Sequence, residues 1–212
     1  MAKTEPFDNH LKEYEEWFDG NHFVYLSELE AIKEVIPTSG RGIEVGIGSG
    51  LFAAPLGIKE GCDPSDEMRS KAEKRELTTT KCVAEDLPYE TVSVDYVLMV
   101  TTICFVDDTS KTFDEIFRVL KPGGSIIVAF VDKDSPVGKI YLKEKGKSLF
   151  YKEATFFSTL DILKLLQDAG FKTEETLQTV FGSMPKIKEV QQWQKGHNEG
   201  SFVVVKAIKN KF

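Results

Sequence analysis

The stretch "RGIEVGIGSG", residues 41–50, decides the fold. Its apolar residues at 43–45 flank one acid, Glu44, and predict a short strand that runs into glycines at positions 46, 48 and 50. Glycine has no side chain, so a glycine backbone approaches a ligand closely and takes conformations with positive φ. Three such positions directly after a strand predict a ligand-binding loop at its carboxyl end.

Strand and helix patterns alternate through the rest of the chain. Further strands are predicted at 56–62, 78–84, 94–100, 125–132, 171–180 and 201–208. Helices are predicted at 7–21, 22–35, 64–75, 109–120 and 159–168, and "KPGG" (121–124) is predicted to be a tight turn. The crossover at 51–55 has room for only about one helical turn. This order predicts an α/β fold, a mainly parallel seven-stranded sheet with helices on both faces.

The composition is that of a globular domain with its own core. The chain has 212 residues, of which 41% are hydrophobic and 29% charged, and it holds no apolar run long enough to span a membrane. The first residues lack an apolar signal segment, so a cytoplasmic location is expected. The net charge of −7 and the scattered basic residues disfavour a nucleic-acid partner. One basic segment, 139–152, fits either a solvated helix or a contact to an anionic ligand.

Cysteine and histidine spacing predicts neither a disulfide nor a metal site. Cys62, Cys82 and Cys104 are odd in number and form no Cys-x-x-Cys pair. The three histidines lie far apart in the sequence and show no metal-ligand spacing. Cys104 follows a predicted strand without a patterned histidine partner, which favours a small buried residue over a nucleophile.

The spacing of the glycines distinguishes three classes of ligand. A phosphate loop of the Walker type needs Lys followed by Ser or Thr, which is absent after Gly50. A dinucleotide loop places its third glycine where this chain has Leu51. The pattern acid-x-Gly-x-Gly-x-Gly is complete from Glu44 to Gly50. A carboxylate beside the loop repels a pyrophosphate and attracts a cation, so a positively charged ligand is favoured.

Five segments in order resemble the class I S-adenosylmethionine-dependent methyltransferases, small-molecule group, which includes the ubiquinone and menaquinone biosynthesis enzymes. They are "EVGIGSG" (44–50), "GCDPSDEM" (61–68), "AEDLPYETVSVDYV" (84–97), "FRVLKPGGSIIVAF" (117–130) and "LLQDAGF" (165–171). The resemblance covers residues 40–132 and continues more weakly to 180. It implies a Rossmann-like doubly wound fold, S-adenosylmethionine as cofactor and a small methyl acceptor.

The resemblance assigns the cofactor site position by position. Glu44 is expected to face the methionine ammonium, and Asp63, 19 residues later, the ribose hydroxyls. The remaining expected cofactor residues are Gly46, Ile47, Gly48, Gly50, Pro64, Met68, Glu85, Asp86, Leu87 and Thr101. Cys82 and Val83 stand where the family often has Gly-Asp, so Asp86 or backbone groups are expected at the adenine. Packing and capping roles stay open for Met68 and Asp63.

The methyl acceptor is expected to be small and partly apolar. Residues 1–39 are predicted to form a helical lid over a domain spanning 40–212, and the acceptor pocket to hold Tyr14, Trp17, Phe18, Phe105 and Tyr151. Further aromatics in these segments are Tyr141, Phe150, Phe156 and Phe157. No residue is assigned as catalytic. The alternatives are a cofactor-binding regulatory module without catalysis and, more remotely, a nicotinamide-dependent oxidoreductase.

Overall fold

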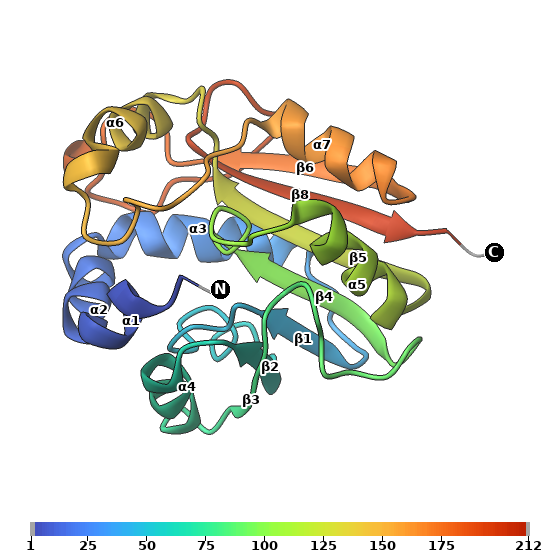
Figure 1. Cartoon of the computed structure of the whole chain (residues 1–212). Coiled ribbons are helices and arrows are strands. Elements are labelled where there is room, and N and C mark those ends of the chain that lie inside the picture. The colour runs from blue at the N-terminus through green and yellow to red at the C-terminus, as the bar shows by residue number, and fades with distance from the viewer. Residues whose placement is uncertain (1–2, 211–212) are drawn as a thin grey trace.

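A mixed sheet forms the centre of the molecule (Figure 1). The computed structural model describes residues 3–210, and their strands form one sheet of order β3-β2-β1-β4-β5-β8-β6-β7. The strands are β1 (Gly42–Val45), β2 (Glu60–Asp63), β3 (Thr78–Lys81), β4 (Val94–Val100), β5 (Leu120–Val131), β6 (Phe171–Thr179), β7 (Gln194–Lys195) and β8 (Phe202–Lys209). β1 to β5 pair in parallel, whereas β8 lies antiparallel between β5 and β6.

Helices cover both faces of this sheet. They are α1 (Glu5–Asn9), α2 (Leu11–Gly20), α3 (His22–Val35), α4 (Asp66–Glu73), α5 (Thr109–Val119), α6 (Pro136–Glu144) and α7 (Thr159–Asp168), with short 3₁₀ turns η1 (Lys145–Lys147) and η2 (Met184–Lys186). Successive strand residues point to opposite faces, so Leu98 packs in the cluster that contains α3, and Val97 in the cluster that contains α5 and α7. The expected doubly wound α/β fold is confirmed.

Local details differ from the sequence prediction. The described sheet has eight strands rather than seven, because the exposed polar pair Gln194–Lys195 adds β7 to β6 without any apolar pattern. The predicted helix at 7–21 is two helices that meet at His10, whose φ of −133° is not helical. The "KPGG" segment is not a separate turn but lies inside β5, beside an irregularity in its pairing with β4.

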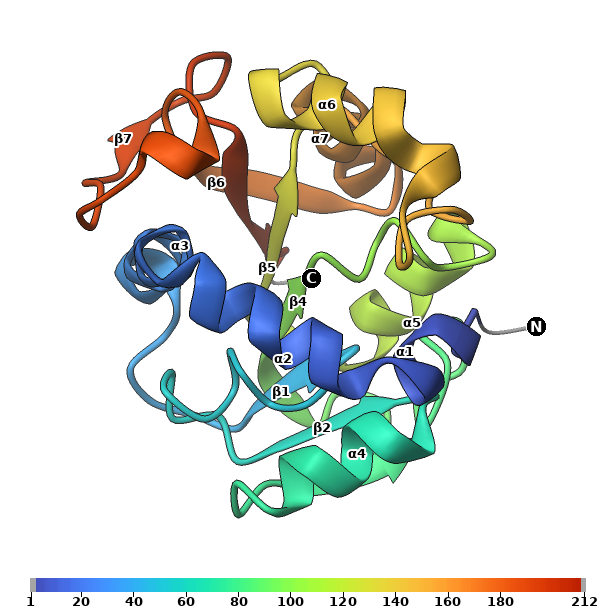
Figure 2. The same ribbon diagram turned by 90° about the vertical axis from the view of Figure 1, so that its left-hand side faces the viewer.

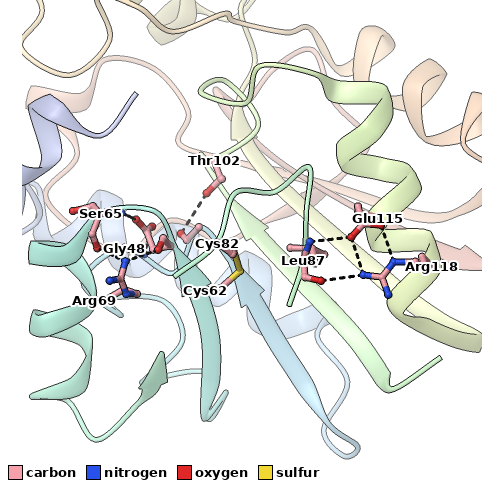
Figure 3. Close-up of a disulfide and its surroundings, with 11 residues drawn as sticks. Gly48, Cys62, Ser65, Arg69, Cys82, Leu87, Thr102, Glu115 and Arg118 are labelled. Carbon is pink, nitrogen blue, oxygen red and sulfur yellow. Dashed lines mark hydrogen bonds and ion pairs between the residues drawn. A yellow bond between two sulfur atoms is a disulfide. The ribbon is translucent and has the colours of Figure 1, made fainter. Parts of the chain in front are cut away.

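A disulfide joins Cys62 to Cys82, which corrects the prediction that these cysteines are unpaired. β2 and β3 are parallel neighbours, and Cys62 is in register with Thr80, two residues before Cys82. The pairing of these strands brings the two Cα atoms to 5.6 Å although 20 positions separate them in sequence. Figure 3 shows the bond at the carboxyl end of the strands, between Gly48 and Leu87. Cys104 is the free, buried cysteine, as expected.

The carboxyl ends of the parallel strands face a group of helices. Figure 1 shows α1, α2 and α6 on the side toward which the arrows of β4 and β5 point, and in Figure 2 α2 and α1 cross in front of β1 and β2. The predicted N-terminal unit, 1–39, also contains α3, which packs on β6 and β8. None of the helices within residues 3–210 is long and apolar enough to cross a bilayer.

Candidate functional site

A cavity of about 490 Å³ lies where the strands end. Its glycine-loop half is lined by Gly46, Gly48, Asp63, Pro64, Ser65, Met68, Cys82, Val83, Ala84, Glu85, Thr101 and Thr102. Its aromatic half is lined by Phe7, Tyr14, Trp17, Phe18, Glu28, Phe105, Tyr141, Phe150, Tyr151, Val180, Met184 and Phe202. These two sets of residues are the glycine-loop half and the aromatic half of the cavity. The volume suits a small molecule or a cofactor with a small partner.

The glycine loop is fixed by the strands around it. The backbone N–H groups of Gly46 and Ile47 both donate to the carbonyl of Cys62, at 2.8 and 3.0 Å. Gly46 has φ +71°, and a Cβ there would lie 2.2 Å from the Thr102 Oγ1 atom, so only glycine fits. Gly48 has φ +53° and faces open space in which the Tyr14 hydroxyl is the near neighbour. The loop thus presents bare backbone to the cavity.

Asp63, at the end of β2, is held by two backbone donors. Gly48 N–H donates to its Oδ2 and Ser65 N–H to its Oδ1, both at 2.9 Å (Figure 3). Burial raises its pKa to about 6, although the two amide hydrogen bonds and nearby Arg69 act in the opposite direction. Its carboxylate therefore lines the cavity in a fixed orientation.

Glu44 lies deeper than the cavity wall. Only 1% of the residue is exposed, and its Oε2 has no hydrogen-bond partner among the described residues. Burial raises the pKa of this carboxyl well above its ordinary value, and the charge of Asp63 adds to the effect. A hydrogen bond from the Ala53 backbone acts in the opposite direction on this pKa, and the unpartnered Oε2 behind the glycine loop favours a positively charged ligand at this end of the site.

The segment 82–87 divides between the cavity and the core. Val83, Ala84 and Glu85 line the cavity, and Glu85 Oε1 accepts from the backbone N–H groups of Asp107 and Asp108 at 2.6 and 3.0 Å. Asp86 is exposed, and its side chain does not line the cavity. This side of the cavity is consequently edged by Val83, Ala84 and Glu85.

Three other predicted cofactor residues support the loop from outside the cavity. The Leu87 side chain is in the core, and its backbone is bound by Glu115 and Arg118 (Figure 3). Ile47 is buried against the sheet, and Gly50 faces Leu77. All three residues pack against the core on their side-chain side. They can therefore contact a ligand only through backbone atoms.

Thr101 and Thr102 form the floor between the two halves. Thr101 has φ +48°, an unusual conformation for a β-branched residue, and its N–H donates to the Ala129 carbonyl at 2.8 Å. Thr102 Oγ1 donates to the Val100 carbonyl at 3.0 Å. Backbone strain of this kind concentrates at functional sites. Cys104, two residues on, donates to the Thr101 carbonyl, and burial raises the pKa of its thiol to about 12.

The aromatic half gathers rings from distant parts of the chain. All five predicted pocket residues, Tyr14, Trp17, Phe18, Phe105 and Tyr151, line it. Tyr151 stacks on Phe105 and on Tyr141, with centroids 5.9 and 5.0 Å apart. Phe7, which sequence reasoning missed, contacts Phe105 and Phe150 edge-on or tilted at 5.1 and 5.5 Å. The basic segment 139–152 gives Tyr141, Phe150 and Tyr151 to the cavity, and no lysine from it lines the wall.

Glu28 is another cavity residue that sequence reasoning missed, and it is the charged one of the aromatic half. It is 6% exposed, and it lines the cavity from α3. The signal was available, because positions 24, 28, 32 and 35 follow helical spacing, and all but 28 are apolar. A charged residue on the apolar stripe of a helix marks either a buried pair or a site.

The glycine-loop half fits S-adenosylmethionine. A cationic ligand matches the two buried carboxyl groups, Glu44 and Asp63, and the bare backbone at Gly46 and Gly48 allows its close approach. Asp63 also lies at the second-strand position where related sheets bind ribose. A pyrophosphate, by contrast, would meet two carboxylates. The described residues thus favour a cationic cofactor over a nicotinamide dinucleotide.

Comparison with known proteins agrees with this geometry. Residues 43–128 match the family model for a methyltransferase domain. A crystal structure of an S-adenosylmethionine-dependent methyltransferase from Thermotoga maritima, named a possible histamine N-methyltransferase, is 45% identical with a TM-score of 0.95, covering 97% of this chain and 99% of that one. An uncharacterized protein of Methanocaldococcus jannaschii is 42% identical over 203 residues, which is 96% of this chain and 98% of that protein.

The quinone-pathway enzymes are more distant relatives. The ubiquinone/menaquinone biosynthesis C-methyltransferase of Rickettsia akari is 30% identical over 155 residues, 65% of this chain and 58% of that enzyme. The chain belongs to the S-adenosylmethionine-dependent methyltransferases, class I. The resemblance drawn from the five sequence segments is therefore confirmed, and with it the cofactor and the general activity.

Proposed function

We propose that this methyltransferase acts on a small, partly apolar molecule held in the aromatic half of the cavity. The observation that carries the proposal is that Trp17, Phe105 and Tyr151 line the same cavity as the glycine loop. Because the space beside the loop measures hundreds rather than thousands of cubic ångströms, a small acceptor suits it better than a protein or nucleic-acid surface.

We further propose the cofactor contacts. Asp63 accepts hydrogen bonds from the ribose hydroxyls, and Gly46 and Gly48 line the methionine and ribose portion. Pro64 and Met68, beside Asp63 on the cavity wall, pack on the adenine. Glu44 acts through the field of its charge or through water, since its side chain lies behind the wall. The bound cofactor supplies a methyl group on a positively charged sulfur, which is a good leaving group.

The chain's own contribution is alignment and enclosure. Holding two reactants in line supplies about 7–11 kcal/mol in favourable cases, and exclusion of water strengthens every charge interaction within the site. We propose that the α1–α2 pair acts as the lid. Ser65 Oγ donates to Asp8 Oδ1 of α1 at 2.6 Å, and Arg75 binds Glu15 of α2 and the Ser49 carbonyl of the glycine loop. Loss of these contacts would open the cavity.

A screen with methyl-labelled cofactor tests the proposal. Small amines, phenols, thiols and carbon acids are offered singly, with protein and RNA fractions as competing acceptors. Because a relative is named a possible histamine N-methyltransferase, histamine belongs in the panel. We expect label in at least one small molecule, and loss of that activity in Trp17→Ala but not in the exposed control Lys12→Ala. Label found only in macromolecules would overturn the proposal.

A further inference from the structure

A buried acid without a partner lines the aromatic half. Glu28 is 6% exposed and lies on α3, which packs against the sheet. Within residues 3–210 its carboxyl forms no hydrogen bond or ion pair. An isolated buried carboxylate is strongly unfavourable, and native proteins rarely keep one without a use.

The surroundings of Glu28 offer it no counter-charge. The titratable groups that face it are the phenols of Tyr14, Tyr25, Tyr141 and Tyr151, from α2, α3, α6 and the segment after it. Burial raises the pKa of each phenol, so all four are uncharged near neutral pH. The Tyr25 hydroxyl donates to the Leu51 carbonyl at 2.5 Å and is therefore engaged elsewhere. Among the described residues no cation pairs with Glu28, so its carboxyl is available to a cationic group that enters the cavity.

The rings around Glu28 suit a cationic or amine group. Tyr141 and Tyr151 stack on each other, and Trp17 and Phe18, 4.9 Å apart between centroids, line the same space. Aromatic faces attract ammonium groups, most strongly when water is excluded, and they also bury apolar carbon. One carboxylate can accept hydrogen bonds from an amine, and the surrounding rings can pack on its apolar substituent.

We propose, building on methyl transfer to a small molecule, that Glu28 binds the amino group of the methyl acceptor and takes its proton. The acceptor class is then a small primary or secondary amine that carries an aromatic or other apolar group. Glu28 would be both a specificity-determining residue and the general base that the sequence did not reveal.

Protons and electrons balance in the transfer of the methyl group to the amine. Glu28 first releases its own proton to solvent as the cationic acceptor enters, because a neighbouring positive charge favours the ionised carboxylate. The acceptor ammonium then gives one proton to this carboxylate, leaving a neutral amine with a free lone pair. That lone pair forms the new N–C bond to the methyl carbon while the C–S bond breaks and its electron pair stays on sulfur. The product is a methylated ammonium, and the proton on Glu28 leaves to solvent when the cavity opens.

The acidity of Glu28 is suited to this transfer. Burial raises its pKa to about 8. An alkylammonium of the lysine type has a pKa of roughly 10.4. The pKa difference between this ammonium and Glu28 is therefore about two, whereas it is about six for an ordinary carboxyl. Proton transfer is most effective between groups of similar pKa, which favours this acid over an exposed one.

Binding of a matched pair of probes tests the inference. Calorimetry with 2-phenylethylamine and with its neutral analogue 2-phenylethanol is run on the full chain saturated with S-adenosylhomocysteine. We expect the amine to bind at least tenfold more tightly than the alcohol, as a charged hydrogen bond implies. Glu28→Gln should abolish this preference, whereas the exposed Glu34→Gln on the same helix should retain it. A preference that survives in Glu28→Gln overturns the inference.

Two further measurements separate this inference from the proposed function and from misfolding. S-adenosylhomocysteine affinity should be unchanged in Glu28→Gln, and Glu28→Met provides a second uncharged variant of similar length. If the methyl-label screen marks only neutral phenols or thiols, the proposed function stands and the Glu28 inference fails. If no small molecule is methylated but the amine preference depends on Glu28, the binding inference stands and the proposed function fails.

Discussion

The two halves of the cavity hold their acids in opposite ways. In the glycine-loop half, Asp63 accepts two backbone N–H groups, from Gly48 and Ser65. In the aromatic half, Glu28 has no partner among residues 3–210. Both are buried, but the pKa of Asp63 is raised to about 6 and that of Glu28 to about 8, because only Asp63 has donors that favour its charged form.

This difference indicates which half is complete before ligands bind. The Asp63 carboxylate is fixed by the loop and β2, and so presents a ready-made acceptor to a constant cofactor. The Glu28 carboxyl forms no hydrogen bond within the described residues, so it can bond to a ligand that enters the cavity. Burying it without a partner lowers the stability of the unliganded protein. On the assignment proposed above, the cofactor site and the acceptor site thus differ in how many hydrogen bonds the protein itself supplies to the acid that each contains.

The largest expected effect is the pH dependence of stability that Glu28 causes. In the unfolded chain its pKa is 4.5, and in the folded protein about 8. Below pH 4.5 both states hold the proton, and between the two values only the folded state does, so stability falls as pH rises and levels off above about 8. From pH 5 to pH 8, the free energy of unfolding of the wild type should fall by about 3.5 kcal/mol more than that of Glu28→Gln.

Urea unfolding at several pH values measures this difference. Other titrating groups are common to both proteins and cancel in the comparison. Glu34→Gln, which changes an exposed acid on the same helix, should follow the wild type. Parallel curves for wild type and Glu28→Gln would show that Glu28 is charged or paired in solution, and the contrast between the halves would disappear.

The second effect is on cofactor affinity. Asp63→Ala should weaken S-adenosylmethionine binding by about tenfold to 100-fold, because charge-assisted hydrogen bonding worth about 1.5–3 kcal/mol in total is lost. Calorimetry measures the affinity, with Asp66→Ala, an exposed acid at the start of α4, as the matched control. Unchanged affinity in Asp63→Ala would mean that the ribose binds elsewhere.

The smallest effect tests the contact between α1 and the aromatic half. Phe7→Ala removes a ring that touches Phe105 and Phe150, and each aromatic pair contributes about 0.5–1.5 kcal/mol. Binding of 2-phenylethylamine should weaken by about threefold to tenfold, and proteolysis within residues 5–20 should become faster. Phe23→Ala, at a ring 39% exposed, is the control. Equal effects from both variants would show that the Phe7 contacts of α1 do not help to cover the aromatic half of the cavity.

The cofactor half was predictable because its chemistry is local in sequence. Glu44 and the alternating glycines lie within seven positions, and Asp63 follows at a spacing that one strand-to-strand crossover dictates. Sequence reasoning placed Asp86, Leu87, Ile47 and Gly50 with them, but in the structure Asp86 is exposed, the side chains of Leu87 and Ile47 lie in the core, and Gly50 faces Leu77. A motif gives the backbone path, whereas the direction of each side chain depends on neighbouring elements.

The sequence by itself determined the sheet, the loop that follows its first strand, and the class of cofactor, because strand period and glycine spacing act over short stretches of chain. Only the tertiary structure decided that Glu28 faces an aromatic cavity without a partner, that Cys62 meets Cys82, and that Phe7 closes over Phe150. Those contacts join residues up to about 140 positions apart in the sequence. They depend on the order of the strands in the sheet and on the packing of the helices, which no local pattern specifies.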